Sequence, residues 1–414
     1  MNCVRRDSRV SIIKVLPVAV FVAVIATMML VVASAQAQTY TVLHDFTGGL
    51  DGSSPHQLIQ GSDGNFYGTA RFGGANDLGN VFEMDPSGVL TVLYSFTGEA
   101  DGCAPQGPVF RDSNGDLYGT TNQCADPKCR CGAFFKLDTN KILTVLHTFT
   151  RGSDGNGADG EFPSNNIVSV NGELYGTTEE GGSNRSGVLY KITKAGHYTV
   201  LQNFVGRGTG SQEDLTRDPS GNIYGEASGS IFELDTAGKF STIYSFTGGV
   251  NDGGGPVGRL ILDAAGTITG AAAYTPAPNP CGLIFRLESN GTVKALHHFG
   301  GAGGVSGCGP ETGLVDMGGT IYGTTADGGD LTCANGNVNC GVLFQISKTG
   351  VYSVVHTFTG LDGGQIQDEL TKGNDGSVYG VSKVGGTGPC EENYPFGCGV
   401  IFKYTQANPV EVNP

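Results

Sequence analysis

The chain has 414 residues, of which 69 are Gly and 17 are Pro, and only 15% are charged, whereas typical globular domains have about 25% charged residues. This composition excludes a coiled coil or another long-helix protein, and the hydrophobic share of 38% excludes a disordered acidic chain. The net charge of −15 argues against nucleic acid as a partner, because nucleic-acid binding needs clustered Lys and Arg. A packed, turn-rich fold remains.

Residues 1–37 have the pattern of a secretory signal peptide. Four basic residues and one acidic residue lie among the first 14, 15–32 is an apolar run, and Ala35-Gln36-Ala37 is a small-x-small cleavage site. Cleavage after Ala37 is favoured, with cleavage after Ala35 or an uncleaved membrane anchor as alternatives. We therefore expect a secreted protein, extracellular or periplasmic, that meets a membrane only through this segment before cleavage.

Three short motifs follow each other in a fixed order along the rest of the chain. In the first complete unit they are FYGTA at 66–70, NVFEM at 80–84 and TVLYSF at 91–96. Seven units occur at intervals of about 50 residues, a period typical of propellers and other repeat architectures. The Tyr-Gly segments, or their equivalents, span 66–70, 117–121, 174–178, 223–227, 268–272, 321–325 and 378–382.

Each unit has the pattern of four short strands rich in Val, Ile, Phe, Tyr and Thr. Strand a follows a recurring Pro, as at 56–60, and connects to the Tyr-Gly strand b through a Gly-bearing hairpin turn such as 63–65. Strand c carries the second motif and strand d the third. We therefore predict an all-β fold, a seven-bladed β-propeller of four-stranded antiparallel blades over residues 38–406, followed by a short tail at 407–414.

The two ends of the repeat region complement each other. Residues 40–46 have the pattern of a strand d without strands a to c before it, and the last unit ends just after its strand c at 400–404. We therefore expect the N-terminal strand to complete the last blade and close the ring. Closure would remove the exposed edges that an open stack presents to other chains.

With these motifs the chain resembles the GloVer tandem-repeat family of exported bacterial proteins, whose unit looks like DGxxP, YGTT, GG, GxVFKL and TVLhsF. The resemblance covers nearly all of residues 39–406. It implies a propeller-like extracellular repeat protein, often with a C-terminal surface anchor, and no established catalytic residues. This sequence departs from the pattern in showing no such anchor, in having Thr269 where Tyr belongs, and in lacking the DGxxP loop after Val205.

Ten cysteines follow the predicted signal peptide, an even number in a chain that we expect to be exported, which favours disulfides. Cys333 with Cys340 and Cys390 with Cys398 each bracket a short loop and are the natural pairs. A zinc site at the CxxxxCxC segment 124–131 is disfavoured because it lacks paired CxxC spacing. The remaining candidates, whose connectivity counting leaves open, are Cys103, Cys124, Cys129, Cys131, Cys281 and Cys308.

A recurring Asp-Gly pair is the candidate binding feature. In the usual propeller arrangement the d-to-a and b-to-c loops share one face, which we expect to be the binding surface. The Asp carboxylates could form a ring that holds Ca²⁺ or sugar hydroxyls. The favoured alternative is that each Asp caps its own turn, a bond worth about 1 kcal/mol, with no metal or other cofactor. The candidates are Asp51, Asp101, Asp159, Asp252 and Asp362.

The histidines and the Tyr-Gly pairs have structural interpretations. His44, His147, His297 and His356 occupy one slot of strand d, which predicts a packing position, whereas His56, His197 and His298 are scattered. We therefore expect no catalytic or metal-binding histidine cluster. The Tyr of each Tyr-Gly pair is expected in the core between blades, and its Gly is expected to let neighbouring sheets approach closely.

Our leading hypothesis is a monomeric, non-catalytic exported propeller that binds an extracellular protein or glycan through its loop-rich face. The first alternative is an extracellular hydrolase or lyase that acts on a polysaccharide with axial Asp and Glu residues. That alternative requires two or more carboxylates to converge within about 10 Å near the axis. The second alternative is a structural component of the cell envelope.

Overall fold

A computed structural model describes residues 38–406, except 126–130, 152–156, 207–213, 278–279, 301–303, 312, 330–332, 334–339, 389 and 391–396. The predicted signal peptide, the tail at 407–414 and Cys129 therefore lie outside the described residues. Within the described part of the chain, no helix has the length and apolar character needed to cross a membrane.

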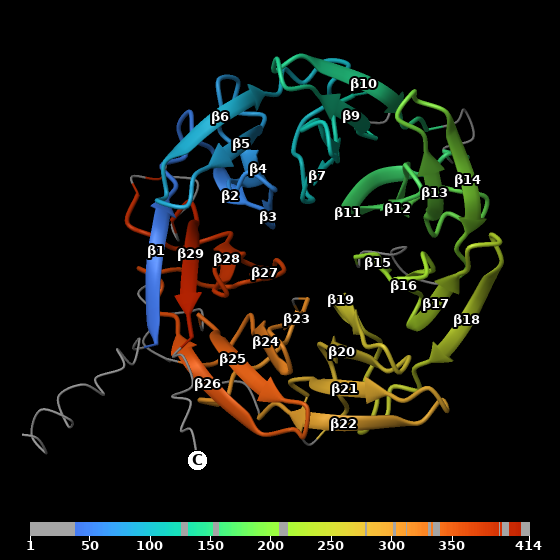
Figure 1. Cartoon of the computed structure of the whole chain (residues 1–414), viewed down its shortest axis with the longest axis vertical. Coiled ribbons are helices and arrows are strands. Elements are labelled where there is room, and N and C mark those ends of the chain that lie inside the picture. The colour runs from blue at the N-terminus through green and yellow to red at the C-terminus, as the bar shows by residue number, and fades with distance from the viewer. Residues whose placement is uncertain are drawn as a thin grey trace, which may run out of the picture. The chain divides into compact units, whose positions relative to one another are not determined.

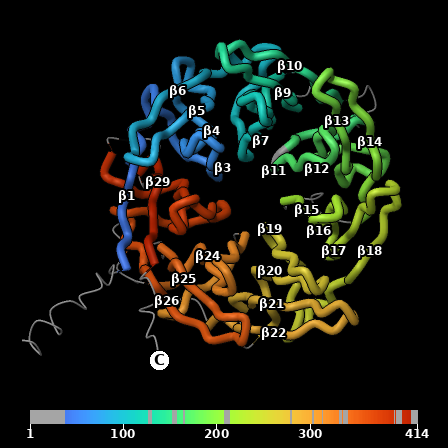
Figure 2. The backbone as a smooth tube through the Cα atoms, in the orientation of Figure 1, coloured from blue at the N-terminus to red at the C-terminus, as the bar shows by residue number. Residues whose placement is uncertain are grey.

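Residues Tyr40–Tyr404 form one compact unit, a ring of seven antiparallel sheets (Figures 1 and 2). This confirms the predicted seven-bladed β-propeller. Strand b, which carries the Tyr-Gly pair or its equivalent, lies between strands a and c in every blade.

Blade one contains β2 (Ser53–Pro55), β3 (Ile59–Gln60), β4 (Phe66–Phe72), β5 (Asn80–Met84) and β6 (Leu90–Ser95); blade two contains β7 (Phe110–Arg111), β8 (Leu117–Thr121), β9 (Ala133–Leu137) and β10 (Leu143–Thr148); blade three contains β11 (Glu161–Val170), β12 (Glu173–Glu180), β13 (Val188–Ile192) and β14 (Tyr198–Asn203). Blade four contains β15 (Thr216–Arg217), β16 (Ile223–Ala227), β17 (Ser230–Leu234) and β18 (Phe240–Ser245); blade five contains β19 (Val257–Leu262), β20 (Ile268–Ala272), β21 (Leu283–Leu287) and β22 (Val293–His298); blade six contains β23 (Val315–Asp316), β24 (Thr320–Thr324), β25 (Val342–Ser347) and β26 (Tyr352–Thr357); blade seven contains β27 (Thr371–Lys372), β28 (Val378–Ser382), β29 (Val400–Thr405) and β1 (Thr39–Asp45).

The ring is closed by strands from opposite ends of the repeat region. The sheet order of blade seven is β1-β29-β28-β27, so the N-terminal strand supplies the outermost strand of the last blade (Figure 1). Just beyond β1, the Phe46 amide donates a hydrogen bond of 3.0 Å to the Gly399 carbonyl oxygen. The predicted closure is confirmed.

The hydrophobic core is divided among the junctions between blades. Among the described residues, each of seven buried clusters lies between two neighbouring blades. Between blades one and two, Tyr67 packs with Leu117 and Phe135. At the closing junction the rings of Phe66 and Tyr379 lie 4.3 Å apart. These contacts confirm that the Tyr of the Tyr-Gly pair belongs to the core between blades.

The Gly of each Tyr-Gly pair has a different role from the predicted one. Gly68 lies opposite Phe82 on the adjacent strand of the same blade, and a Cβ at Gly68 would stand 2.6 Å from the Phe82 ring. The other six equivalents likewise face the ring on their own strand c. The expectation that these glycines let neighbouring sheets approach was therefore wrong, because they make room for an aromatic ring inside one sheet.

In five blades the innermost strand is shorter than the sequence pattern suggests. In blade one the predicted strand at 56–60 is regular only at Ile59–Gln60, and β7, β15, β23 and β27 also have two residues each. Blades three and five differ, because their innermost strands β11 and β19 have ten and six residues. The residues just before the two-residue strands, such as Pro108, line cavities at the centre of the ring.

Candidate functional site

The d-to-a and b-to-c loops share one face, as predicted. In blade one the Gly74 amide, in the b-to-c loop, donates a hydrogen bond of 2.9 Å to the Gly49 carbonyl oxygen in the d-to-a loop. Two disulfides connect the same two kinds of loop, Cys103–Cys124 and Cys281–Cys308. We call this surface the loop face and the opposite surface, with the a-to-b turns, the hairpin face.

Disulfides are formed by the predicted cysteines. Cys333–Cys340 and Cys390–Cys398 are bonded, which confirms both natural pairs, and Cys103–Cys124 and Cys281–Cys308 complete the four bonds seen within the described residues. Cys131 is also disulfide-bonded.

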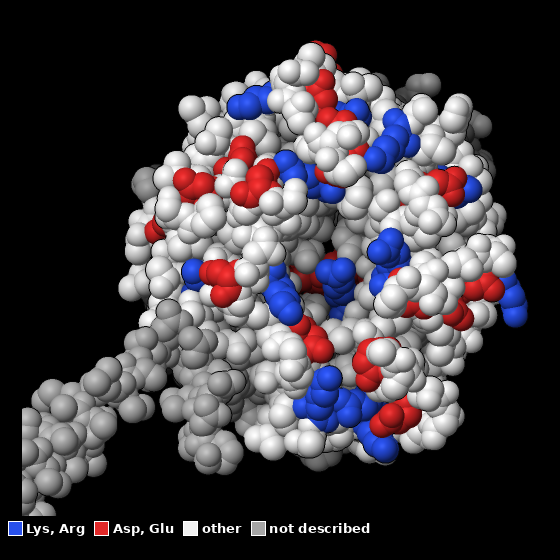
Figure 3. All heavy atoms as spheres, in the orientation of Figure 1, with Lys and Arg blue, Asp and Glu red and all other residues white. Residues whose placement is uncertain are grey.

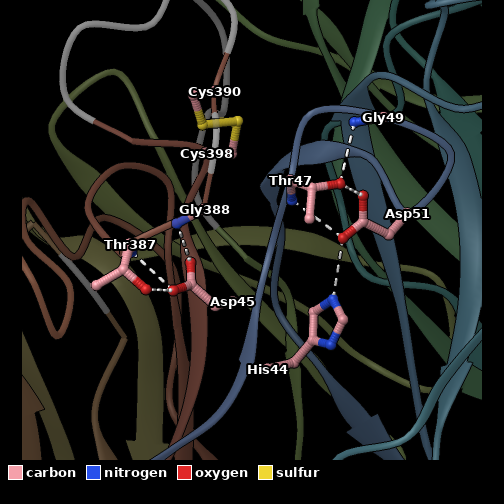
Figure 4. The surroundings of a disulfide bond; sticks show 9 residues. All are labelled: His44, Asp45, Thr47, Gly49, Asp51, Thr387, Gly388, Cys390 and Cys398. Atoms are coloured by element: carbon pink, nitrogen blue, oxygen red, sulfur yellow. Dashed lines mark hydrogen bonds and ion pairs between the residues drawn. A yellow bond between two sulfur atoms is a disulfide. The ribbon is translucent and has the colours of Figure 1, made fainter.

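The five predicted Asp residues, which we call the turn aspartates, are bonded within their own loops. The Asp51 carboxylate accepts hydrogen bonds from the Thr47 amide at 3.0 Å and hydroxyl at 2.5 Å, and lies 3.2 Å from His44 Nε2 (Figure 4). Asp101 repeats this pattern with Thr97 and Tyr94. The other three bond to equivalent Thr and His or Tyr residues.

These contacts leave the turn aspartates dispersed around the ring. Burial alone would raise the pKa of Asp51, but hydrogen bonds from His44 and Thr47 outweigh it and the pKa is lowered. Among the described side chains, no three His, Cys, Asp or Glu residues gather into a group that could hold a metal ion. The chemistry of the turn aspartates is therefore that of caps on their own turns.

The repeated histidines of strand d also occupy packing positions. The His147 ring stacks on Tyr198 of the next blade at 4.0 Å, and the His297 ring stacks on Tyr352 at 3.8 Å. The same contact joins His356 to Tyr40 across the ring closure, at 3.7 Å. The prediction of a packing role is confirmed for these residues.

One position in the repeat carries a different residue in every blade. It directly precedes a buried apolar residue at the start of the innermost strand, such as Leu58 in blade one or Leu370 in blade seven. Every residue at this position lines one of two cavities on the propeller axis. We call them the axial residues: Gln57, Pro108, Asn166, Asp214, Arg259, Gly313 and Glu369.

The two axial cavities adjoin each other, because Gln57 and Pro108 line both. The wide cavity has a volume of about 950 Å³ and includes residues of the a-to-b turns, so it opens at the hairpin face. The narrow cavity has a volume of about 330 Å³. Basic side chains surround the central hollow and acidic atoms are visible deeper in it (Figure 3).

Two buried carboxyl groups meet where the cavities adjoin. The carboxyls of Glu369 in blade seven and Asp214 in blade four interact, and Gln57 Nε2 donates a hydrogen bond to Glu369 Oε2 at 2.9 Å. Asp214 Oδ1 accepts from the Asn166 amide at 2.7 Å. A Cβ at Gly313 would collide with Glu369 Oε1, so the Gly of blade six provides the space that the Glu369 carboxyl occupies.

Both carboxyls hold protons more tightly than exposed carboxyls do. Burial and the neighbouring Asp214 charge hold the pKa of Glu369 well above its ordinary value, although the Arg259 charge, 4.0 Å away, acts to lower it. Burial also raises the pKa of Asp214, against the hydrogen bond that it accepts from Glu369. Two like charges in one buried site disfavour each other, so one carboxyl stays protonated while the other is ionised.

A second polar group lines the narrow cavity. His56 Nδ1 lies 3.1 Å from Asp368 Oδ1, and Lys383 Nζ lies 3.4 Å from Asp368 Oδ2. Burial lowers the pKa of His56 despite this carboxylate, so the ring is neutral. Among the described residues, the buried His56 Nε2 and Gln57 Oε1 have no hydrogen-bond partner. Describing His56 as scattered was therefore wrong, because it lies beside the axial carboxyls.

The sequence interpretation missed all of these residues because it looked for what recurs. Asp214, Glu369 and Asp368 belong to no motif, and each is unremarkable in its own unit. A signal was available, since aligning the seven units on their buried apolar residue shows one adjacent position that never repeats.

Comparison with known proteins agrees with the fold. Virginiamycin B lyase from Staphylococcus aureus is 13% identical, with a TM-score of 0.57 over 89% of this chain and 99% of that chain. An extracellular domain from B. thetaiotaomicron, described as part of a hybrid two component system, is 12% identical with a TM-score of 0.55, and the match covers 92% of this chain but 44% of that chain. At these identities the likeness shows the propeller fold alone, and no curated protein matches the sequence. The model of the Gloeobacter/Verrucomicrobia repeat matches residues 31–230 and 226–412, so the chain belongs to this family of repeat proteins.

Proposed function

We propose that this protein is an exported enzyme, a hydrolase or lyase that acts on a polysaccharide with acid–base chemistry in the axial cavities. The observation that carries the proposal is that two buried carboxyls, Asp214 and Glu369, line the same axial cavity. The enzymatic alternative in the sequence analysis required two or more carboxylates to converge near the axis. The turn aspartates, on which the binding hypothesis relied, already have partners of their own.

The axial groups have complementary acid and base capacities. Protonated Glu369 can donate to a leaving oxygen, and Asp214 or neutral His56, whose Nε2 is free, can accept a proton. A directly hydrogen-bonded pair stands closer than the roughly 5 Å of a glycosidase pair. The shared-proton dyad, in which two carboxyls keep different protonation states, therefore describes the arrangement better.

The substrate class follows from the cavity lining and from export. Amide, carboxyl, guanidinium and hydroxyl groups line the wide cavity, and amide, carboxyl, imidazole and ammonium groups line the narrow one. These groups match the hydroxyl-rich surface of a sugar. The disulfides suit an oxidising, extracytoplasmic compartment, where polysaccharides are accessible. The wide cavity has room for more than one sugar ring.

The test is turnover of a polysaccharide panel by the secreted protein. New reducing ends would report cleavage, and ultraviolet absorbance of an unsaturated product would distinguish a lyase from a hydrolase. We expect Glu369→Gln and Asp214→Asn to lower turnover by about 100-fold or more. The control is Glu288→Gln, a substitution on the β21–β22 hairpin outside both cavities, with folding of each variant checked by circular dichroism.

The proposal fails if no polysaccharide is cleaved. It also fails if the two axial substitutions leave turnover at the level of the control while the proteins remain folded.

A further inference from the structure

We propose that the wide cavity recognises an anionic group, so that the substrate is an acidic oligosaccharide or polysaccharide whose sugar rings carry carboxylate or sulfate. Arg217 of blade four and Arg259 of blade five would bind this group. This inference rests on the proposed function for its position next to the axial carboxyls, but its evidence is the balance of charge in the cavity.

Two of the charged side chains that line the wide cavity form ion pairs with other side chains of the protein. Arg111 Nη2 lies 2.7 Å from Asp63 Oδ2, and its guanidinium covers the Tyr67 ring at 5.0 Å. Asp112 Oδ2 lies 2.5 Å from Lys194 Nζ. Neither group therefore contributes uncompensated charge to the cavity.

The other two lining charges are guanidinium groups that are paired less closely than Arg111 and Asp112. Arg217 Nη1 donates to the Ser169 carbonyl oxygen at 2.8 Å, and the described residues offer Arg217 no ion pair. Arg259 Nη1 lies 4.0 Å from Glu369 Oε2, a long distance for an ion pair, and its charge also acts on Asp214. The side chain of Arg259 is 44% exposed. The wide cavity thus carries excess positive charge in a chain whose net charge is −15.

The two arginines line the wide cavity from adjacent parts of the ring. Arg217 and Arg259 come from neighbouring blades, at β15 and at β19, and line the same cavity. The planar guanidinium fork matches a carboxylate or sulfate, and such charge-assisted bonds are about twice as strong as neutral ones. Because Arg259 also lies beside Glu369, an anionic sugar held there would place its linkage next to the carboxyl pair.

The experiment measures binding by calorimetry, independently of turnover. Three sets of oligosaccharides are compared on the full secreted protein: galacturonate oligomers, sulfated galactose oligomers and neutral galactose oligomers. We expect the acidic sets to bind at least tenfold more tightly than the neutral set and to weaken with added salt. The carboxylate and sulfate sets tell which anionic group the cavity prefers.

Substitution assigns the effect to the two arginines. Arg259→Gln and Arg217→Gln should each weaken binding of the preferred acidic set by roughly ten- to a hundredfold, the range expected for a charge-assisted hydrogen bond, and leave neutral sugars unaffected. Arg185→Gln, an exposed arginine of the β12–β13 loop outside both cavities, is the matched control.

The outcomes separate this inference from the proposed function. Binding without charge preference, no binding at all, or equal losses in all three variants would overturn the anionic subsite, even if turnover persists. Charge-dependent binding that needs Arg259 and Arg217, in a protein that cleaves no polysaccharide, would support the subsite and refute the enzyme.

Discussion

The turn aspartates and the axial residues lie in the same repeat units but differ in how they vary from blade to blade. Asp101 and its equivalents make the same bonds to Thr and to a strand d side chain in each of their blades. The axial position changes from Gln57 to Asp214 to Glu369, and its side chains bond across blades rather than within one loop.

This difference separates residues that stabilise each repeat unit from residues that act only in the assembled ring. A residue that recurs in every unit solves a problem that every unit has, such as satisfying the amides of a turn. A residue that appears once cannot serve the repeat as such. Its chemistry therefore belongs to the assembled ring, and the irregular position is where a site is built.

The largest expected effect compares two glycines, one recurrent and one axial. Gly270→Ala would place a Cβ 2.5 Å from the Phe285 ring inside blade five, and we expect a loss of about 3 kcal/mol or more in the free energy of unfolding. Gly313→Ala meets the Cγ, the carboxyl carbon and Oε1 of Glu369, a flexible side chain that can rotate away, so we expect near-normal stability.

Thermal melting and the turnover assay would test this pair together. Gly313→Ala should displace the Glu369 carboxyl and impair turnover or sugar binding in a protein that melts normally. If both variants lost stability equally, the proposed difference between the recurrent Gly270 and the axial Gly313 would be wrong.

An intermediate effect is expected at a turn aspartate. Asp101 is buried and accepts hydrogen bonds from the Thr97 amide, the Thr97 hydroxyl and the Tyr94 hydroxyl. Asp101→Ala should therefore cost about 2 kcal/mol of unfolding free energy, and Asp101→Asn, which keeps one acceptor, should cost less. Denaturant unfolding checks this, with and without Ca²⁺ or a chelator. A melting temperature that rises with Ca²⁺ in the wild type would instead favour the calcium hypothesis.

The smallest effect is a pH dependence of opposite sign in the two regions. Burial would raise the pKa of Asp362, but hydrogen bonds from His356 and Thr359 lower it, so its stabilising contribution is present above its unfolded pKa near 4 and is lost as pH falls. Burial raises the pKa of Glu369, so its contribution is present at acidic pH and is lost as pH rises through the raised pKa.

Melting curves of two variants would show the contrast. Asp362→Asn should lower the unfolding free energy by about 1 kcal/mol at neutral pH but not near pH 3. Glu369→Gln should match the wild type under acid and be more stable by about 1 kcal/mol at alkaline pH, since one pKa unit corresponds to about 1.4 kcal/mol. Parallel pH profiles would contradict the assignment of the shared proton.

Much of the fold could be predicted because its signals are local and repeated. The Tyr-Gly and strand c segments predict β4, β5 and their equivalents in the other blades. The pairing of β1 with β29 was predictable from the incomplete unit at each end of the repeat region. Cys333 with Cys340 and Cys390 with Cys398 were predictable because each pair closes a short loop. The role of Gly68 was not, since it depends on which side chain lies across the strand pair.

The candidate site, in contrast, depends on residues that do not recur and are far apart in the sequence. Repetition in the sequence by itself determined the number of blades, the order of their strands and the closure of the ring, because each unit must bury its apolar face against the next. Only the tertiary structure decided that Asp214 and Glu369, 155 positions apart in the chain, line one cavity, and that His56 lies beside them. No local pattern encodes the proximity of these residues. It results from the diameter of a seven-bladed ring and from small side chains at the axial position of other blades, which leave space at the centre.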